Sequence, residues 1–229
     1  LPILAAAVAI YLAHNPAARA LLRFVKDGWF NFIDATFFMT MLHTQRFLAF
    51  ILVAWIGPGL IAPDLANGAL PLYLSRPLSR AEYLLGKATL LVTLLSAVTW
   101  IPCLLLFLLN SAFADGHWWS LHLRIAWATV ASGMAWITVM SLLSLALSAW
   151  IPWRLGASAM LFGIFFVSGG LGETAAVALH IPWGRLLSVS HLFDQVSAQL
   201  FGVLRVGTGE PVVAAWFGLM FLSALSLLI

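Results

Sequence analysis

Charged side chains are scarce in this sequence. Asp, Glu, Lys and Arg make up only 8% of its 229 residues, whereas hydrophobic residues make up 63%. Soluble globular domains carry about 25% charged residues, so this scarcity excludes an ordinary soluble domain and indicates an integral membrane protein. The 11 basic residues are scattered among loops, where they are typical of membrane-surface anchors, so the net charge of +3 does not indicate a nucleic-acid partner.

Several chemical motifs are also absent. The single cysteine, Cys103, excludes an internal disulfide bond. No phosphate-binding loop of the G-x-x-x-x-G-K-S/T type occurs, so we do not expect this chain to hydrolyse ATP. No G-x-S-x-G elbow and no H-x-x-x-H or paired Cys/His spacing occurs, so the sequence indicates neither a serine nucleophile nor a metal site.

Six apolar runs alternate with more polar loops. A helix needs about 20 residues to cross the core of a bilayer, and most of the runs are long enough. The runs are Leu1–Leu12, Phe47–Pro63, Ala88–Leu109, Ile125–Trp150, Leu155–Leu179 and Val212–Ile229. We therefore expect one all-α polytopic membrane domain over residues 1–229 with six transmembrane helices. Because the first run is short and begins without methionine, we expect the chain to be cut inside its first spanning helix, and the last run ends as abruptly.

Two stretches between the runs are typical of amphipathic helices. Asn15 and Pro16 form a helix start, and a helix that carries basic residues along one face is suited to the membrane surface. The basic residues on this face are Arg19, Arg23 and Lys26. His191–Val206 is a second amphipathic candidate on the same side. We therefore expect amphipathic or re-entrant helices in the outer loops.

The number of basic residues in the loops favours one orientation. Loops 13–46, 110–124 and 180–211 contain seven, whereas 64–87 and 151–154 together contain four. The seven are Arg19, Arg23, Lys26, Arg46, Arg124, Arg185 and Arg205. By this count alone, the positive-inside rule would place residues 64–87 outside the cell.

One stretch, GPGLIAPDLANGALPLYLSRPLSRAEYLLGK, mixes charges, prolines and turn residues with leucines. Asn67-Gly68 predicts the end of a helix, because both residues tolerate the left-handed backbone. Pro71 suits the first turn of a new short helix, and Pro77 ends that helix. The SRAE sequence that starts at Ser79 has the spacing of a capping box, which predicts a fresh helix running into the third apolar run.

The same stretch, Gly57–Lys87, resembles the loop between the second and third helices of ABC-2 type permeases, which are membrane subunits of ATP-binding cassette transporters. In this family an acidic residue near the end of the second helix precedes a Gly, a Leu-rich short helix, a Pro, a Ser-Arg pair and a Gly-Lys pair. The corresponding residues are Asp64, Gly68, Leu70, Leu72, Leu74, Pro77, Ser79, Arg80, Gly86 and Lys87. Many relatives carry a glutamate-rich run where this chain has DLANGALP.

The resemblance implies that residues 64–87 are a cytoplasmic coupling segment, against the count of basic residues. A short coupling helix at Leu70–Leu74 would dock into a cytosolic ATPase, because apolar anchors supply most of the energy of such contacts. The residues assigned to this coupling role are Asp64, Gly68, Leu70, Leu72, Tyr73, Leu74, Arg76, Pro77, Ser79, Arg80, Glu82 and Lys87.

The resemblance also implies the partners of the chain. These are a cytosolic ATPase dimer that carries ATP and Mg²⁺, and a second permease copy that is either identical or related. Membrane lipids and accessory periplasmic subunits complete the expected set, and no cofactor is expected on this chain. The expected activity is export by alternating access in a bacterial inner membrane.

Glu173 is the only carboxylate inside an apolar run, in the sequence SGGLGETAAV. The neighbouring glycines allow the helix either to break or to pack closely there. Glu173 is therefore a candidate pathway residue, and the alternative is a helix-terminal carboxylate in water. Two other classes of function are alternatives to the permease: a membrane enzyme that acts on lipids, using Glu173 and the outer histidines, and a secondary transporter.

Overall fold

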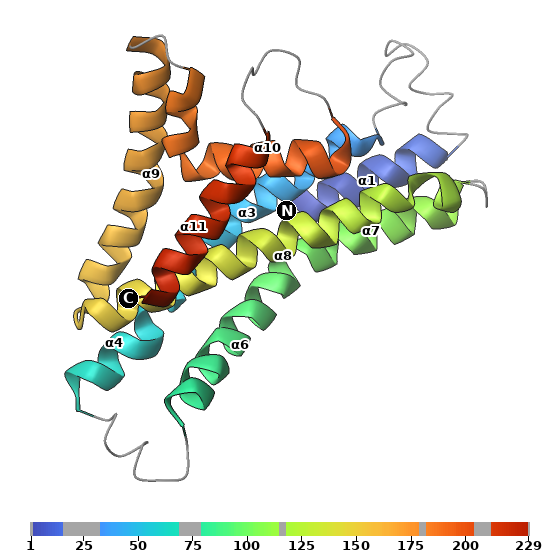
Figure 1. The fold of residues 1–229 in the computed structure, drawn as a ribbon. Coiled ribbons are helices and arrows are strands. Elements are labelled where there is room, and N and C mark those ends of the chain that lie inside the picture. Colours follow the sequence, from blue (N-terminus) through green and yellow to red (C-terminus); the bar gives the residue numbers. More distant parts are fainter. Residues whose placement is uncertain are drawn as a thin grey trace.

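The computed structural model describes residues 2–15, 33–68, 79–114, 118–178, 182–203 and 212–228. These residues form helices and contain no strand. Figure 1 shows the arrangement. The helices are α1 (Pro2–His14), α3 (Ala35–Ile56), α4 (Pro58–Ala66), α6 (Arg80–Val98), α7 (Trp100–Phe113), α8 (Trp118–Trp150), α9 (Arg154–Ala178), the 3-10 helix η3 (Pro182–Leu187), α10 (Val189–Phe201) and α11 (Val212–Leu228).

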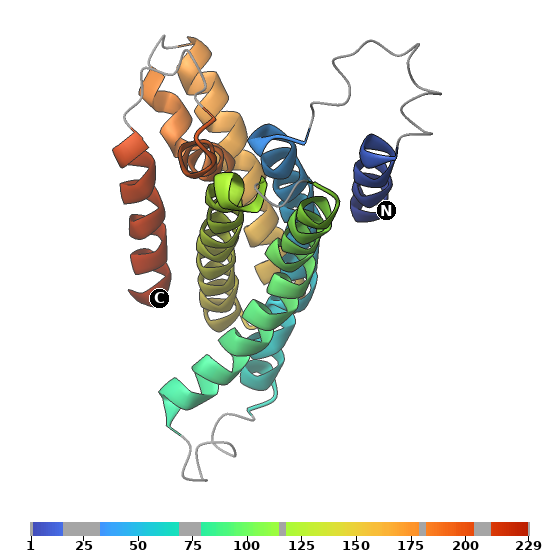
Figure 2. The ribbon, with the colours of Figure 1, turned by 90° about the vertical axis from the view of Figure 1, so that its right-hand side faces the viewer.

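Four helical segments in the described ranges are long and apolar enough to cross a membrane. They are Ala35–Asp64, Ala81–Phe113, Trp118–Trp150 and Arg154–Ala178. Shorter apolar helices lie at either end of the chain, at Pro2–Leu12 and Val213–Leu227. In Figure 2 the end of α4 and the start of α6 lie together at one end of the bundle, and η3 and α10 lie toward the other. The chain is a multi-pass, all-α membrane protein.

Helix α3 begins at Ala35, well before the apolar run that was expected to start at Phe47. Arg46, which we counted as a loop residue, is therefore inside the helix, with only 6% of its surface exposed. The loop assignment of Arg46 is wrong, because the helix-spaced apolar residues Phe38 and Leu42 extend the buried face toward the N-terminus. Removing Arg46 from the loop count leaves six basic residues on that side against four.

Two of the long segments are kinked at prolines. Pro58 has no N–H to donate to the carbonyl of Ala54, and that carbonyl instead accepts a hydrogen bond from the Ser158 hydroxyl of α9 at 2.8 Å. Pro102 likewise leaves the Val98 carbonyl without its helical donor. The buried Gln45 of α3, with its amide nitrogen turned toward α6 and α7, donates to the carbonyls of Val98 and Thr99. Side chains from neighbouring helices thus satisfy the backbone groups that the prolines leave free.

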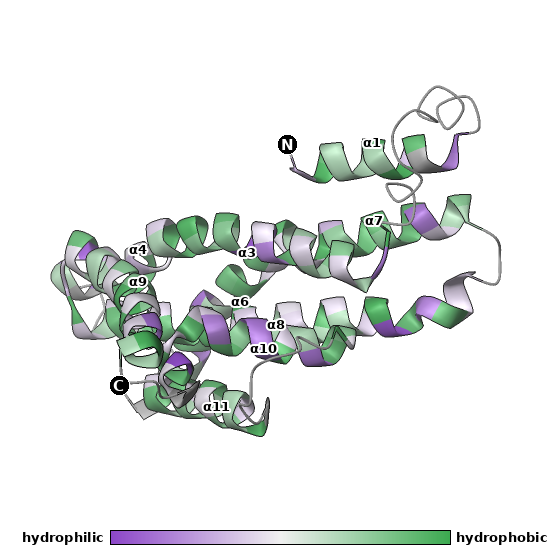
Figure 3. Ribbon diagram, turned by 90° about the horizontal axis from the view of Figure 1, so that it is seen from above, coloured by the Kyte–Doolittle hydropathy of each residue, from purple (hydrophilic) through white to green (hydrophobic). Residues whose placement is uncertain are grey.

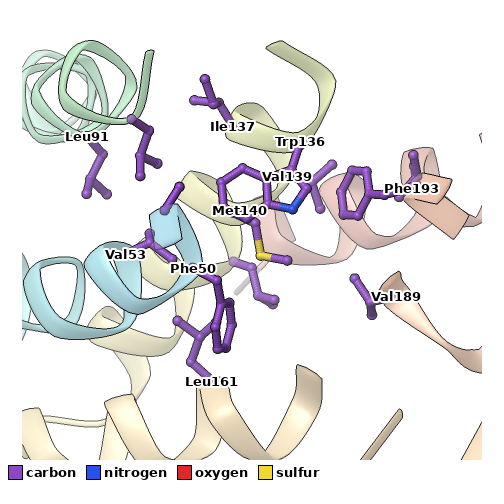
Figure 4. Packing of buried hydrophobic residues seen from close by; sticks show 14 of the residues in the cluster. Phe50, Val53, Leu91, Trp136, Ile137, Val139, Met140, Leu161, Val189 and Phe193 are labelled. Atoms are coloured by element: carbon purple, nitrogen blue, oxygen red, sulfur yellow. The ribbon is translucent and has the colours of Figure 1, made fainter. Parts of the chain in front are cut away.

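The main hydrophobic core lies where α3, α6, α8, α9 and α10 meet. Figure 4 shows the side chains of this core gathered between the helices. Phe50, Val53, Leu91, Met140 and Leu161 are each no more than 1% exposed. A second cluster joins α1, α3 and α7 farther along the bundle, around Ile10, Phe38 and Phe107. Seen from above, hydrophobic residues prevail along the helices, with hydrophilic positions interspersed on α3, α8 and α10 (Figure 3).

The amphipathic helix predicted at His191–Val206 is present in part as α10, which begins at Val189 and ends at Phe201, before Gly202 with φ of +72°. Its start is capped by Ser188, whose hydroxyl accepts a hydrogen bond from the backbone N–H of His191 at 3.4 Å. Its buried face includes Leu192, Phe193 and Val196. The other amphipathic helix, predicted after Asn15, falls in 16–32, outside the described residues.

Candidate functional site

The end of α4 and the start of α6 are joined by a polar contact. One carboxylate oxygen of Asp64, Oδ2, accepts hydrogen bonds from the Tyr83 hydroxyl at 2.6 Å and from Lys87 Nζ at 3.1 Å. Tyr83 and Lys87 are four residues apart on α6 and therefore share one face. The Lys87 and Asp64 side chains are 27% and 20% exposed, so both are shielded from solvent more than ordinary surface charges are. We call residues 64–68 and 79–87 the base.

Helix α4 ends inside the base, where the sequence predicted a helix stop. The backbone N–H of Asn67 still donates to the Pro63 carbonyl at 3.0 Å. Gly68 then has φ of +63°, in the left-handed region that ends helices and favours glycine. The predicted helix stop is confirmed.

Helix α6 begins with the predicted capping box. The Ser79 hydroxyl oxygen accepts a hydrogen bond from the Glu82 backbone N–H at 3.2 Å. In return, the Ser79 backbone N–H donates to Glu82 Oε2 at 2.7 Å. These reciprocal bonds fix the first turn of α6 and therefore the direction in which the chain enters it. The capping box is confirmed.

Ser148 on α8 is hydrogen-bonded to the first turns of α4, just after the kink at Pro58. Ser148 Oγ accepts hydrogen bonds from the backbone N–H groups of Ala62 at 2.9 Å and Ile61 at 3.3 Å. Its hydroxyl donates to the Pro58 carbonyl at 2.9 Å. These bonds cross between two helices, so Ser148 ties α4 to α8.

A polar cluster built on the buried Arg46 joins α3 to α8 and α10, nearer the opposite end. Arg46 Nη1 donates to Ser197 Oγ at 2.8 Å, and Nη2 donates to the Ser132 carbonyl at 2.9 Å. One turn earlier on α3, His43 Nδ1 lies 3.0 Å from Asp194 Oδ1 on α10. The cluster fixes α10 against the bundle.

Glu173 lies in the last two turns of α9. Its Oε1 is 3.6 Å from Arg185 Nε on η3, and its side chain is 62% exposed. The helix does not break at the neighbouring glycines, because α9 continues to Ala178. Instead Gly172 packs closely against the chain after η3, since an added Cβ would come within 3.0 Å of Ser188 Cβ. The role of Glu173 in a transport pathway stays a prediction.

The family model for ABC-2 family transporter proteins matches residues 4–227, which is almost the whole chain. The chain belongs to this family. Its predicted resemblance to an ABC-2 type permease is therefore confirmed. No curated protein matches the chain. The permeases of this family are transmembrane components of transporters, which agrees with the multi-pass helical fold, and membership implies association with an ATP-binding cassette ATPase.

The structure brings together only part of the coupling segment predicted for this permease. Asp64, Gly68, Ser79, Glu82 and Lys87 gather at the base. The remaining predicted residues are Leu70, Leu72, Tyr73, Leu74, Arg76 and Pro77, which fall in 69–78 outside the described residues, and Arg80, whose side chain is also not described. Their part in docking stays a prediction.

The sequence did not predict two sets of contacts between helices, those of Arg46 and those of Ser148. Arg46 carried a usable signal, because the apolar residues Leu42 and Phe50 lie at helical spacing on either side of it. Ser148 carried none, since serine is common inside apolar helices and its partners on α4 are known only from the fold.

Proposed function

We propose that this chain is the membrane-spanning subunit of an ABC exporter, with six transmembrane helices and its base in the cytoplasm. Residues 64–87 would dock into a separate cytosolic ATPase dimer that binds ATP and Mg²⁺. The spans would comprise α1, the kinked pairs α3–α4 and α6–α7, α8, α9 and α11. The remaining expectations, including the bacterial inner membrane and accessory subunits, belong to the same proposal.

The observation that carries this proposal is the construction of the base. A segment that transmits force must be fixed at both ends, because slack at either end would absorb the movement. Here Asp64 joins the two ends through Lys87, and Ser79 fixes the first turn of α6. A push on residues 69–78 would therefore move α4 and α6 together, which is the kind of rigid-element motion that drives domain switching.

Alternating access needs two such chains, either identical or related, with a pathway between them. ATP binding would bring the two ATPase subunits together and move both bases. The two packings of the helices would then open the pathway to one side of the membrane or the other. The kinks at Pro58 and Pro102 are places where such helices can bend with little disturbance to their hydrogen bonds.

Co-purification tests this proposal. A tagged chain extracted in a mild detergent should bring with it an ATP-binding cassette ATPase, which we expect to be encoded beside it. Leu74→Asp and Arg80→Glu should reduce the amount of bound ATPase, because they alter the docking segment. Leu121→Asp is the matched control, since Leu121 is 67% exposed on α8 near the opposite end.

The contrary result is equally clear. If the chain carries no ATPase and the two docking variants keep full transport activity, the permease does not work through this segment. Activity toward lipids without ATP would then favour the membrane enzyme, and activity driven by an ion gradient would favour the secondary transporter.

A further inference from the structure

A small pocket of about 100 Å³ opens between α3, α8, α9 and α10. Its aromatic lining is Phe47, Trp136, Phe165 and Phe193, and its polar lining is His43, Arg46, Ser190 and Asp194. Arg46 precedes Asp64 by 18 residues, or roughly 27 Å of helix at 1.5 Å per residue, so the pocket is well separated from the base.

The guanidinium of Arg46 is not fully matched by the protein. Its two terminal nitrogens donate to Ser197 and to the Ser132 carbonyl. Its Nε is buried and has no hydrogen-bond partner in the part of the chain that the structure describes. A buried charged donor without an acceptor is costly, so a ligand oxygen placed beside it would be favourable.

The acid in the pocket does not supply the missing acceptor. Asp194 Oδ1 lies 3.0 Å from His43 Nδ1, and the ion pairs found among the described residues do not include Arg46. Asp194 attracts Arg46 through space, but none of its oxygens contacts the guanidinium, so Nε still lacks an acceptor among the described residues. The pocket retains a preference for a negative oxygen at its Arg46 side.

The walls and mouth indicate what the rest of the ligand is. Phe165 stacks on Phe50 with ring centroids 4.3 Å apart, so this wall is held in place by the core. At the mouth, Phe47 is 53% exposed and is followed along α3 by the exposed Leu48 and Ile51. An apolar chain can lie along this track while its polar end enters the pocket, as is usual in mostly apolar sites with few polar groups.

We propose that this pocket binds the oxyanion of an amphiphile, a phosphate or carboxylate attached to an apolar chain. The guanidinium of Arg46 donates to the oxyanion, the Ser190 hydroxyl lies in the same lining, and the apolar chain leaves past Phe47. A phospholipid headgroup and a soluble amphiphilic acid share this chemistry. The site is independent of the ATPase contact, so its test needs no ATPase.

Native mass spectrometry of the full chain tests the proposal. The chain is placed in nanodiscs of dioleoylphosphatidylcholine, and dodecyl phosphate is added as the soluble probe. We expect one bound dodecyl phosphate, with dodecanol unable to replace it. Arg46→Gln should weaken binding about tenfold or more, the loss typical of one charge-assisted hydrogen bond.

Two further variants make the result decisive. Ser190→Leu fills the pocket without touching the bonds of Arg46 and should also abolish binding, which keeps the test valid if Arg46→Gln does not fold. Arg124→Gln is the matched control, because Arg124 also bonds α10, at the carbonyls of Leu200 and Gln199, but lies outside this pocket. It should bind the probe as the unmodified chain does.

A second arm identifies the source of the ligand. Dioleoyl phosphatidic acid in the nanodisc should displace dodecyl phosphate if the site takes a lipid headgroup, and should leave it bound if the site takes soluble acids. Either result supports the proposal when it depends on Arg46. Binding that is equal in the unmodified chain, Arg46→Gln and Ser190→Leu, or no stronger than that of dodecanol, would overturn it.

Discussion

The Asp64 carboxylate accepts a hydrogen bond from the Tyr83 hydroxyl at 2.6 Å, between the end of α4 and the first turns of α6. Lys87 donates to the same oxygen from one turn farther along. The two ends of the described chain on either side of residues 69–78 are therefore held together. Under the proposed function, a push from the cytosolic ATPase would enter the membrane helices here.

Asp64→Asn should loosen the base. The substitution removes the charge that Lys87 pairs with, and hydrogen bonds to charged groups contribute about 1.5–3 kcal/mol when they are shielded. We expect a loss of stability near the lower end of this range, because both side chains are partly exposed. Thermal unfolding in detergent measures it. Tyr83→Phe removes only one hydrogen bond and should cost less. Equal stability of the unmodified chain, Asp64→Asn and Tyr83→Phe would show that these bonds do not stabilise the base.

Ser79→Ala should release the first turn of α6. Loss of a serine cap typically costs about 1 kcal/mol, which corresponds to roughly fivefold faster local opening. Hydrogen exchange at the amides of Glu82 and Tyr83, which both donate to Ser79, measures this opening directly. Ser79→Asp keeps an acceptor at the cap and should largely preserve protection, so slow exchange in Ser79→Ala would contradict the capping role.

Ser148→Ala should destabilise the kinked segment α4. The change removes the hydrogen bonds that join α4 to α8, and one such bond typically contributes about 0.5–1.5 kcal/mol. Ser141→Ala is the matched control on the same helix, because the Ser141 hydroxyl only donates to the carbonyl of Ile137 in its own helix. If the two variants lose equal thermal stability, the hydrogen bonds between Ser148 and α4 do not stabilise the protein as proposed.

Gly202→Ala should cost more than Gly68→Ala. Both glycines have positive φ, +72° and +63°, so each alanine pays about 1–2 kcal/mol of backbone strain. At Gly202 the new Cβ would also come within 2.8 Å of the Arg124 guanidinium, whereas nothing lies within 4 Å at Gly68. Displacing Arg124 forfeits its bonds to the end of α10. Thermal unfolding should therefore rank the two variants, and the reverse order would contradict this reading.

The features of the base that could be predicted from sequence are local ones. The helix stop at Gly68 and the capping box at Ser79 depend on residues within a few positions of each other, so their spacing is visible in the sequence. The helical character of the apolar runs follows from composition and length in the same way. Family resemblance then connected these local signals to a coupling role.

The features that could not be predicted depend on distant partners. Two nitrogens of Arg46 bond residues 86 and 151 positions away, so its helical spacing was visible in the sequence but these partners were not. Ser148 bonds a segment 86 to 90 positions away, across a kink whose geometry comes from packing. The contact between Glu173 and Arg185 likewise depends on the packing of η3 beside α9, which the sequence does not show.

Cross-linking from position 73 tests whether the segment between α4 and α6 contacts a cytosolic ATPase. A photoreactive phenylalanine analogue in place of Tyr73 lies in the segment predicted to dock, and the same analogue at Trp119, 41% exposed on α8, provides the control. After illumination in native membranes, we expect a covalent product between the chain and an ATP-binding cassette ATPase from position 73 only. No ATPase product from position 73, in membranes where the chain is present and transport is active, would contradict it.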